Sequence, residues 1–166
     1  FKYCGDEGTD ATPPYVVATN ILSKTPIAYN QTSANVEFYI NEPAECRWTH
    51  DSDKSFDDME GRMSCAQRVT EFNIQNVYPC KTTLTGIKDN VENKFYVKCK
   101  DKPLATDGRN TMARGYEYIL TGTKPLVISD VAPNGTIRDS IEAVKVTLKV
   151  ETTAGYKDGE AICSFS

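Results

Sequence analysis

The sequence is poor in the residues that build metal centres and catalytic sites. His50 is the only histidine in 166 residues, and no two of the six cysteines form a C-x-x-C pair. Structural zinc sites bring their ligands in such close pairs, so we expect no zinc and no other cofactor. No G-x-S-x-G motif or comparable set of nucleophile, base and oxyanion donors is present. We therefore expect that the chain is not an enzyme and that His50 lies at a strand end.

Long apolar runs and clusters of positive charge are lacking as well. No run approaches the ~20 residues that a helix needs to cross a bilayer, and no basic segment leads into an apolar signal core. Lysine and arginine are scattered through a chain of net charge -4. Such a surface offers no basic stripe to hold a phosphate backbone. We expect no membrane insertion in this segment and no nucleic-acid partner.

Alternation of apolar and polar residues is the strongest pattern that the sequence does contain. In "VKVTLKVET", apolar residues occupy positions 144, 146, 148 and 150, which is typical of a half-buried antiparallel strand. Similar segments, separated by Pro, Gly, Asn and Asp, predict further strands at 14–21, 34–41, 45–50, 93–100, 116–122 and 125–131. So many short strands predict an all-β chain with a sandwich fold. The predicted core consists of Val36, Phe38, Ile40, Trp48, Phe95 and Val97.

The segment from 49 to 82 fits this pattern less well. It mixes helix formers with a weak stripe through Phe56, Met59 and Met63. This spacing predicts one or two short helical turns. We interpret the segment as an insertion where a sandwich crosses between its sheets, with Cys65 and Cys80 joining its ends.

Three segments of the chain recur elsewhere in it. "TPPYVVATNI" corresponds to "KPLVISDVAP" about 111 residues later. "VEFYINEPAECRW" corresponds to "VTLKVETTAGYKDGEAICSF", which aligns Cys46 with Cys163. "FKYCGDEG" corresponds to "FYVKCKDK", which aligns Cys4 with Cys99. Self-similarity at a long, fixed period is typical of tandem modules.

The recurrence predicts how the chain is divided. We expect residues 1–12 to be the end of a preceding repeat, 13–123 a complete module, and 124–166 the first strands of a following repeat. Cys4 and Cys163 would then be inter-repeat cysteines. We expect no bond between these two within one copy.

Two further features resemble known families. "TLTGIKDNVENKFYVKC" resembles the corner between the fifth and sixth strands of fibronectin type III domains, with Leu84, Gly86 and Ile87 in the first part. Phe95 stands where that family usually has tyrosine, so the tyrosine-corner hydrogen bond is missing. "AECRW", "FYVKC", "VISDVAPNGT" and "GEAICSFS" resemble tandem Ig-like repeats of large bacterial and archaeal surface proteins. The resemblance implies an Ig-like or fibronectin type III-like β-sandwich at the cell surface, and no particular chemistry.

The even number of cysteines favours disulfides in an oxidising, extracellular compartment, with reduced buried thiols as the alternative. In a type III sandwich the strands that carry Cys46 and Cys99 are neighbours in one sheet. The resemblance therefore implies a Cys46–Cys99 bridge beside Trp48 and a Cys65–Cys80 bridge that closes a loop of about 15 residues. Pairing in sequence order, Cys46–Cys65 with Cys80–Cys99, is the other option.

An acidic run offers candidate calcium ligands: Asp51, Asp53, Asp57 and Asp58. Calcium prefers six to eight oxygen ligands, several of them from carboxylates. The spacing does not match the EF-hand loop, and a solvated acidic loop is the alternative interpretation.

Aromatic residues at positions that we expect to face outward offer a candidate binding platform for sugar or peptide: Tyr39, Tyr96, Tyr116 and Tyr118. Tyrosine is also a good strand former, so these residues have a purely structural interpretation.

The sequence as a whole favours a non-enzymatic structural or adhesive module of an extracellular surface protein or filament. Its expected partners are neighbouring repeats, copies of itself, or a cell-surface protein or glycan. The alternative is a carbohydrate- or peptide-binding module appended to a larger secreted enzyme.

Overall fold

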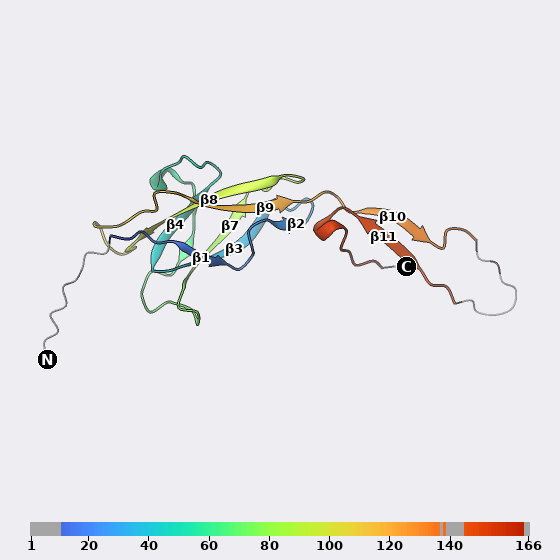
Figure 1. Cartoon of the computed structure of the whole chain (residues 1–166), viewed down its shortest axis with the longest axis horizontal. Helices are drawn as coiled ribbons and strands as arrows, with labels where there is room; N and C mark the ends of the chain where they lie inside the picture. The colour runs from blue at the N-terminus through green and yellow to red at the C-terminus, as the bar shows by residue number, and fades with distance from the viewer. Residues whose placement is uncertain (1–10, 137, 139–144, 165–166) are drawn as a thin grey trace. The chain divides into compact units, whose positions relative to one another are not determined.

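The structure is a computed structural model that describes residues 11–136, 138 and 145–164 (Figure 1). Strands dominate it, and the described helices are two single 3-10 turns, η1 (Phe56–Asp58) and η2 (Tyr156–Asp158). The predicted all-β class is confirmed. The chain forms two compact units, each described by itself. The first contains Ser33–Thr85 and Lys94–Ile119 with the described residues up to Ser23. The second contains Lys24–Thr32, Gly86–Asn93 and the described residues from Leu120 onward.

One sheet has four antiparallel strands in the order β1-β3-β7-β6. These are β1 (Val16–Thr19), β3 (Ser33–Ile40), β7 (Tyr78–Thr85) and β6 (Ser64–Cys65). β3 and β7 pair along their whole length. Sequence reasoning placed most of β7 inside the insertion, which was wrong: its inward residues alternate regularly, but proline and threonine weaken the apolar signal.

The other sheet has five strands in the order β2-β9-β8-β4-β5. These are β2 (Thr25–Ile27), β9 (Tyr116–Gly122), β8 (Glu92–Asp101), β4 (Ala44–Thr49) and β5 (Gly61–Arg62). β2 runs parallel to β9, whereas β4 is antiparallel to both β5 and β8. Sequence reasoning did not find β2, because three residues that include a proline carry no alternation.

The two sheets pack face to face in the first unit. The rings of Phe38 on β3 and Tyr118 on β9 lie edge to face with centroids 5.1 Å apart. The indole N–H of Trp48 on β4 donates a 3.0 Å hydrogen bond to Thr82 Oγ1 on β7. All residues of the predicted core are buried, with at most 7% of their surface exposed. The chain is therefore a β-sandwich whose strands alternate as the sequence predicted.

Close packing against the Trp48 indole requires a glycine at position 61 on the neighbouring strand. Gly61 on β5 pairs with Trp48, and a Cβ atom at Gly61 would lie 2.3 Å from the indole ring. Only glycine lets the edge strand approach the ring so closely.

The insertion contains a single helical turn, η1. Phe56 and Met59 are buried and Met63 is half-buried, so the predicted stripe does face inward. The Arg47 guanidinium lies over the Phe56 ring at 4.7 Å and donates a 3.0 Å hydrogen bond to the Asp57 carbonyl. These contacts hold the turn against β4.

A hairpin of β10 (Val127–Ala132) and β11 (Lys149–Thr153) lies in the second unit. Its register repeats that of β1 with β3, because each residue of the hairpin stands 112 positions after its counterpart. The pairs are Val16↔Ile40, Ala18↔Tyr39 and Thr19↔Phe38 in one case and Ile128↔Thr152, Asp130↔Glu151 and Val131↔Val150 in the other. Both ladders shift register at the same place, between Val16 and Ala18 and between Ile128 and Asp130. The boundaries predicted at residues 12 and 123 stay predictions.

Asn93 holds the corner between β7 and β8. Sequence reasoning assigned no role to this residue. Its side-chain oxygen accepts a 2.8 Å hydrogen bond from the Lys88 N–H. Its amide group lies within donating distance of the carbonyls of Lys88, Val91 and Leu120, at 2.9, 3.2 and 3.3 Å. This buried amide therefore ties the corner to itself and to β9, which contains Leu120.

We predict that Phe95→Ala lowers the free energy of unfolding by about 3–5 kcal/mol, because Phe95 is fully buried between the sheets. The matched control is Phe72→Ala, since Phe72 is 50% exposed in a loop, and it should cost less than about 1 kcal/mol. Urea unfolding followed by the fluorescence of Trp48, the only tryptophan, measures both. Equal unfolding midpoints for the two variants would show that the Phe95 side chain does not face the core.

We also predict that Asn93→Ala costs about 2–4 kcal/mol, because it leaves several buried backbone groups without a partner. Asn35→Ala, in which the exposed Asn35 loses one hydrogen bond to Thr83, is the control and should cost less than about 1 kcal/mol. The same urea titration compares them. An Asn93→Ala midpoint equal to that of the control would rule out the corner role.

Candidate functional site

Four cysteines form two disulfides across neighbouring strands. Cys46 on β4 is bonded to Cys99 on β8, and Cys65 on β6 is bonded to Cys80 on β7. The structure thus contains the nested pairing and not the pairing in sequence order. Each bridge lies within one sheet, so neither bond joins the two sheets covalently.

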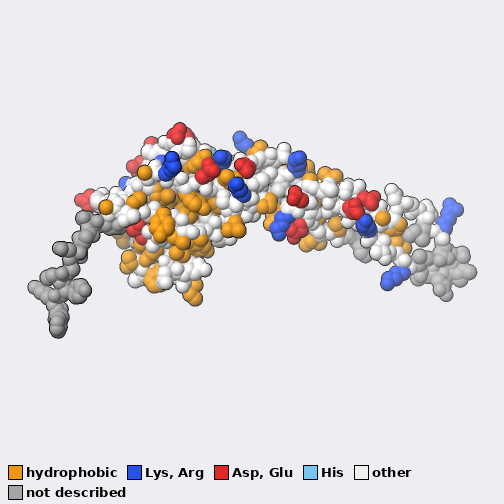
Figure 2. All heavy atoms as spheres, viewed as in Figure 1, with side chains coloured by type: hydrophobic (Ala, Val, Ile, Leu, Met, Phe, Trp, Pro, Cys, Tyr) orange, Lys and Arg blue, Asp and Glu red, His pale blue; other side chains and the backbone are white. Residues whose placement is uncertain are grey.

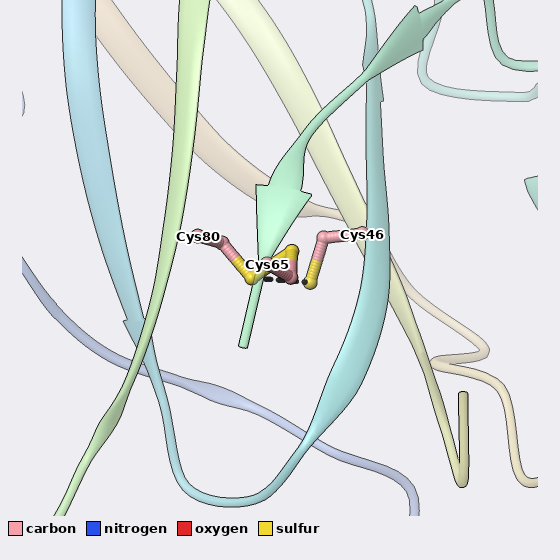
Figure 3. Close-up of side chains that lie close together, drawn as sticks. All are labelled: Cys46, Cys65 and Cys80. Atoms are coloured by element: carbon pink, nitrogen blue, oxygen red, sulfur yellow. Dashed lines mark hydrogen bonds between the residues drawn. A yellow bond between two sulfur atoms is a disulfide. The ribbon is translucent and has the colours of Figure 1, made fainter. Parts of the chain in front are cut away.

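The two disulfides meet in the middle of the sandwich. In Figure 3 the side chains of Cys46 and Cys80 extend toward each other from facing strands, and their Sγ atoms are 3.5 Å apart. Among the described residues, the group whose potential ligand atoms lie within 4.8 Å of one another is Cys46, Cys65 and Cys80. Disulfide sulfur is not a thiolate and does not bind metal in that way. The cluster is therefore a packed structural centre.

His50 directly follows the last residue of β4, at the rim of this core. Its Nδ1 lies 3.1 Å from the Lys94 carbonyl oxygen and its Nε2 lies 3.0 Å from the Thr85 carbonyl oxygen. Its ring also contacts Phe95, with centroids 4.6 Å apart. Both nitrogens face the backbone rather than a nucleophile, as expected for a histidine at a strand end.

The structure does not bring the four candidate calcium ligands together. Asp51, Asp53, Asp57 and Asp58 are exposed. Asp51 accepts a hydrogen bond from the Asp53 N–H at 3.0 Å, and Asp58 accepts one from the Ser55 hydroxyl at 2.6 Å. The carboxylates of Asp51 and Asp58 thus accept hydrogen bonds from the same loop, and among the described residues the four aspartates do not form a group that could hold a metal ion.

Two of the four candidate tyrosines point into the core, which corrects the outward assignment. Tyr118 is fully buried, and its hydroxyl donates a 3.0 Å hydrogen bond to the Ile21 carbonyl. Tyr116 is half-buried and packs edge-on against Phe38, with ring centroids 6.5 Å apart. Residues 118–120 are all apolar and all buried, including Ile119. The sequence of β9 therefore does not show by alternation which of its side chains face the core.

The other two candidates lie on different sheets. Tyr39 is on β3, whereas Tyr96 is on β8 and donates a 3.2 Å hydrogen bond to Glu117. Both side chains are half-buried. The four tyrosines therefore do not form one platform.

Apolar side chains are also exposed at one end of the sandwich. At this end, loops connect β3 to β4, β6 to β7 and β8 to β9. The three connecting loops are 41–43, 66–77 and 102–115. A groove of about 440 Å³ lies between Pro43, Gln67 and Leu104. Figure 2 shows hydrophobic atoms exposed over this part of the chain. The most exposed members are Val69, Phe72, Ile74 and Leu104. We call this surface the loop end.

Charged residues that sequence reasoning missed fix the longest of these loops. Asp101 is fully buried and accepts a 2.8 Å hydrogen bond from the Asn110 side chain. Arg109 donates a 2.8 Å hydrogen bond to the Asp101 carbonyl. These contacts join the end of β8 to the middle of the loop, eight and nine residues later, so no local sequence pattern predicts them.

Glu45 lies between two arginines beside this loop. Its carboxylate is 3.1 Å from Arg47 and 3.2 Å from Arg109. Partial burial raises the pKa of Glu45, but hydrogen bonds from the two guanidinium groups more than offset it and hold the pKa below its ordinary value. The ionised form of Glu45 thus helps to position Arg109.

No protein-family model, no curated protein and no solved structure matches this chain. Within the part of the chain that the structure describes, no helix is long and apolar enough to span a membrane. Of the two predicted inter-repeat cysteines, Cys163 is an exposed free thiol and Cys4 lies outside the described residues. The fold defines a disulfide-bonded β-sandwich, a class that is typical of secreted proteins.

We predict that stability falls between about pH 10 and pH 12 in a way that depends on Tyr118. Burial, together with the nearby Tyr116, raises the pKa of Tyr118 from 10.0 to about 12. In this window the unfolded chain loses the phenol proton that the folded chain keeps, so the contribution is present below pH 10 and is lost as pH rises. Tyr118→Phe should show a smaller fall than the wild type in alkaline urea titrations. Tyr15→Phe, at an exposed site, is the control, and the same fall in both variants would contradict the assignment.

Proposed function

We propose that the chain is a non-enzymatic structural module of an extracellular surface protein or filament built from Ig-like repeats. The observation that carries the proposal is the shared register of the two strand pairs, β1 with β3 and β10 with β11. A register shift at the same place in both ladders is a specific feature, because β-bulges, which shift the register in this way, are retained within families. Two copies of one strand pair in a chain of this length support a repeat architecture.

The strand order supports the Ig-like assignment within the sandwich class. In immunoglobulin-like domains the first, second, fifth and fourth strands form one sheet, and the third, sixth and seventh form the other. With β2 taken as the continuation of β1, the order β1-β3-β7-β6 corresponds to the first sheet and β4-β8-β9 to the second. Such sandwiches serve many roles, so the fold alone does not choose one.

The disulfides support the extracellular setting. Two bridges in one small sandwich are rare where glutathione keeps thiols reduced, and are common in secreted proteins. The Cys46–Cys99 bridge between β4 and β8, which correspond to the third and sixth strands of the Ig-like order, also suits a load-bearing element. It ties together residues 53 positions apart, which limits how far the module can extend if it opens.

The loop end favours a second candidate function, a binding module for a carbohydrate or a peptide. Loops at one end of such sandwiches carry the binding sites of many family members. Ile74 and Val69 are 98% and 69% exposed, and exposed apolar groups of this kind mark contact surfaces.

The proposed function is tested on intact cells that produce the chain. A membrane-impermeant amine reagent, followed by alkylation of free thiols and mass spectrometry, reports exposure and oxidation together. We expect the chain to be labelled without lysis, and its cysteines to be recovered as Cys46–Cys99 and Cys65–Cys80. Labelling only after lysis, with all four thiols freely alkylated, would contradict the proposal. Specific micromolar binding on glycan or peptide arrays, lost in Phe72→Ala and kept in Tyr29→Ala, would instead favour the second candidate.

A further inference from the structure

Solvent reaches the four bridged cysteines to different degrees. Cys46, Cys80 and Cys99 are at most 1% exposed, whereas Cys65 is half-buried. Cys65 lies on β6, a strand of two residues at the edge of its sheet, and the loop 66–77 follows it directly. A short edge strand of this kind opens more readily than the centre of a sheet. A thiol in solution therefore meets the Cys65–Cys80 bridge first, at the Cys65 sulfur.

The other sulfur of this bridge touches the second bridge. Cys80 Sγ lies 3.5 Å from Cys46 Sγ, and Figure 3 shows the two side chains extending toward each other from facing strands. Two residues further along the same two strands, Trp48 and Thr82 are joined by a 3.0 Å hydrogen bond. This second, independent contact shows that β4 and β7 face each other at this point. Cys80 and Cys46 are therefore direct neighbours across the two sheets.

We propose that Cys65 is an attack site for small-molecule thiols, and that the released Cys80 then takes Cys46 from Cys99. The two bridges within the sheets are replaced by one bond between the sheets, Cys46–Cys80, and by a mixed disulfide at Cys65. Sulfur atoms 3.5 Å apart are already in contact, so the transfer needs only a small movement of the two strands. The inference concerns the cysteines of one sandwich and does not rest on the proposed function.

The exchange consists of two displacements. The thiolate of a small thiol such as glutathione attacks the Cys65 sulfur, the bond to Cys80 breaks, and Cys80 leaves as a thiolate. The thiolate is the nucleophilic form of cysteine, so Cys80 needs no base. It attacks the Cys46 sulfur, forms Cys46–Cys80, and releases Cys99 as a thiolate, which takes up the proton that glutathione gave to water. One glutathione thiol is consumed, one cysteine thiol is released, and the number of disulfide bonds does not change.

The exchange changes what holds the sandwich together. Each present bridge lies within one sheet, because β4 pairs with β8 and β6 pairs with β7. The bond Cys46–Cys80 joins β4 of one sheet to β7 of the other, across a sequence separation of 34. The two sheets then stay linked at this point when the sandwich opens. Every displacement is reversible, so the share of each pairing follows the concentration of thiol around the protein.

The test uses the full chain with Cys4→Ser and Cys163→Ser, so that only the four bridged cysteines can exchange. This parent variant is incubated with reduced glutathione and no denaturant. Free thiols are then alkylated, and the linked peptides are identified by mass spectrometry. The fluorescence of Trp48, the only tryptophan, checks that the chain stays folded.

We expect the first product to contain glutathione on Cys65, a Cys46–Cys80 bond and an alkylated Cys99. A first product with glutathione on Cys65, an alkylated Cys80 and an intact Cys46–Cys99 bridge would overturn the proposal. A first product in which glutathione is bonded to Cys46 or Cys99 would overturn it as well, because Cys65 would then not be the attack site.

Two further variants of the parent isolate the second displacement. Cys65→Ser leaves Cys80 as a thiol in contact with the other bridge, so at about pH 8.5 it should form Cys46–Cys80 without glutathione. Cys80→Ser is the matched control, because it removes the sulfur that touches Cys46. In glutathione it should lose Cys46–Cys99 at least about tenfold more slowly than the parent. Equal rates of loss in the control and the parent, or a Cys65→Ser variant that keeps Cys46–Cys99 with Cys80 alkylated, would contradict the transfer.

Discussion

The structure depends on what covers the inward face of β3. Phe38 and Ile40 are fully buried there, and burial of each large apolar side chain contributes about 1.5–3 kcal/mol. Neither disulfide joins the two sheets, so non-covalent contacts such as this apolar packing and the Trp48–Thr82 hydrogen bond hold them together. A single strand pair cannot supply that cover for itself. The hairpin of β10 and β11 is the direct illustration, because its equivalent face stays exposed.

The disulfides and the charged loop contacts have a secondary role that follows from this arrangement. Cys46–Cys99 and Cys65–Cys80 each staple neighbouring strands and then pack sulfur against sulfur in the interior. They restrict the unfolded chain more than they bind the sheets to each other. Asp101 and Arg109 order the long loop at one end of the sandwich. Apolar side chains of the loop end, such as Val69 and Leu104, are exposed beside this ordered loop.

Sequence reasoning succeeded where one side of a strand meets the core and the other meets water. The alternation in β3 and β8 predicted the inward set, including Phe38 and Phe95, and these residues are buried. It failed where the period-two signal is diluted. Tyr118 was placed outward because apolar residues follow one another in β9. Most of β7 was assigned to the insertion because threonines occupy inward as well as outward positions. Asn93 and Asp101 could not be found at all, because their roles depend on backbone groups brought near by folding.

The central claim is that β10 and β11 repeat the pairing of β1 and β3. Cross-strand nuclear Overhauser effects in the full chain test it most directly, because they report which backbone positions face each other in solution. The account predicts contacts between the backbones of Thr19 and Phe38 and between those of Val131 and Val150, with the register shift at the same place in both pairs. A hairpin that pairs in another register, or an unpaired segment from 127 to 132, would contradict it.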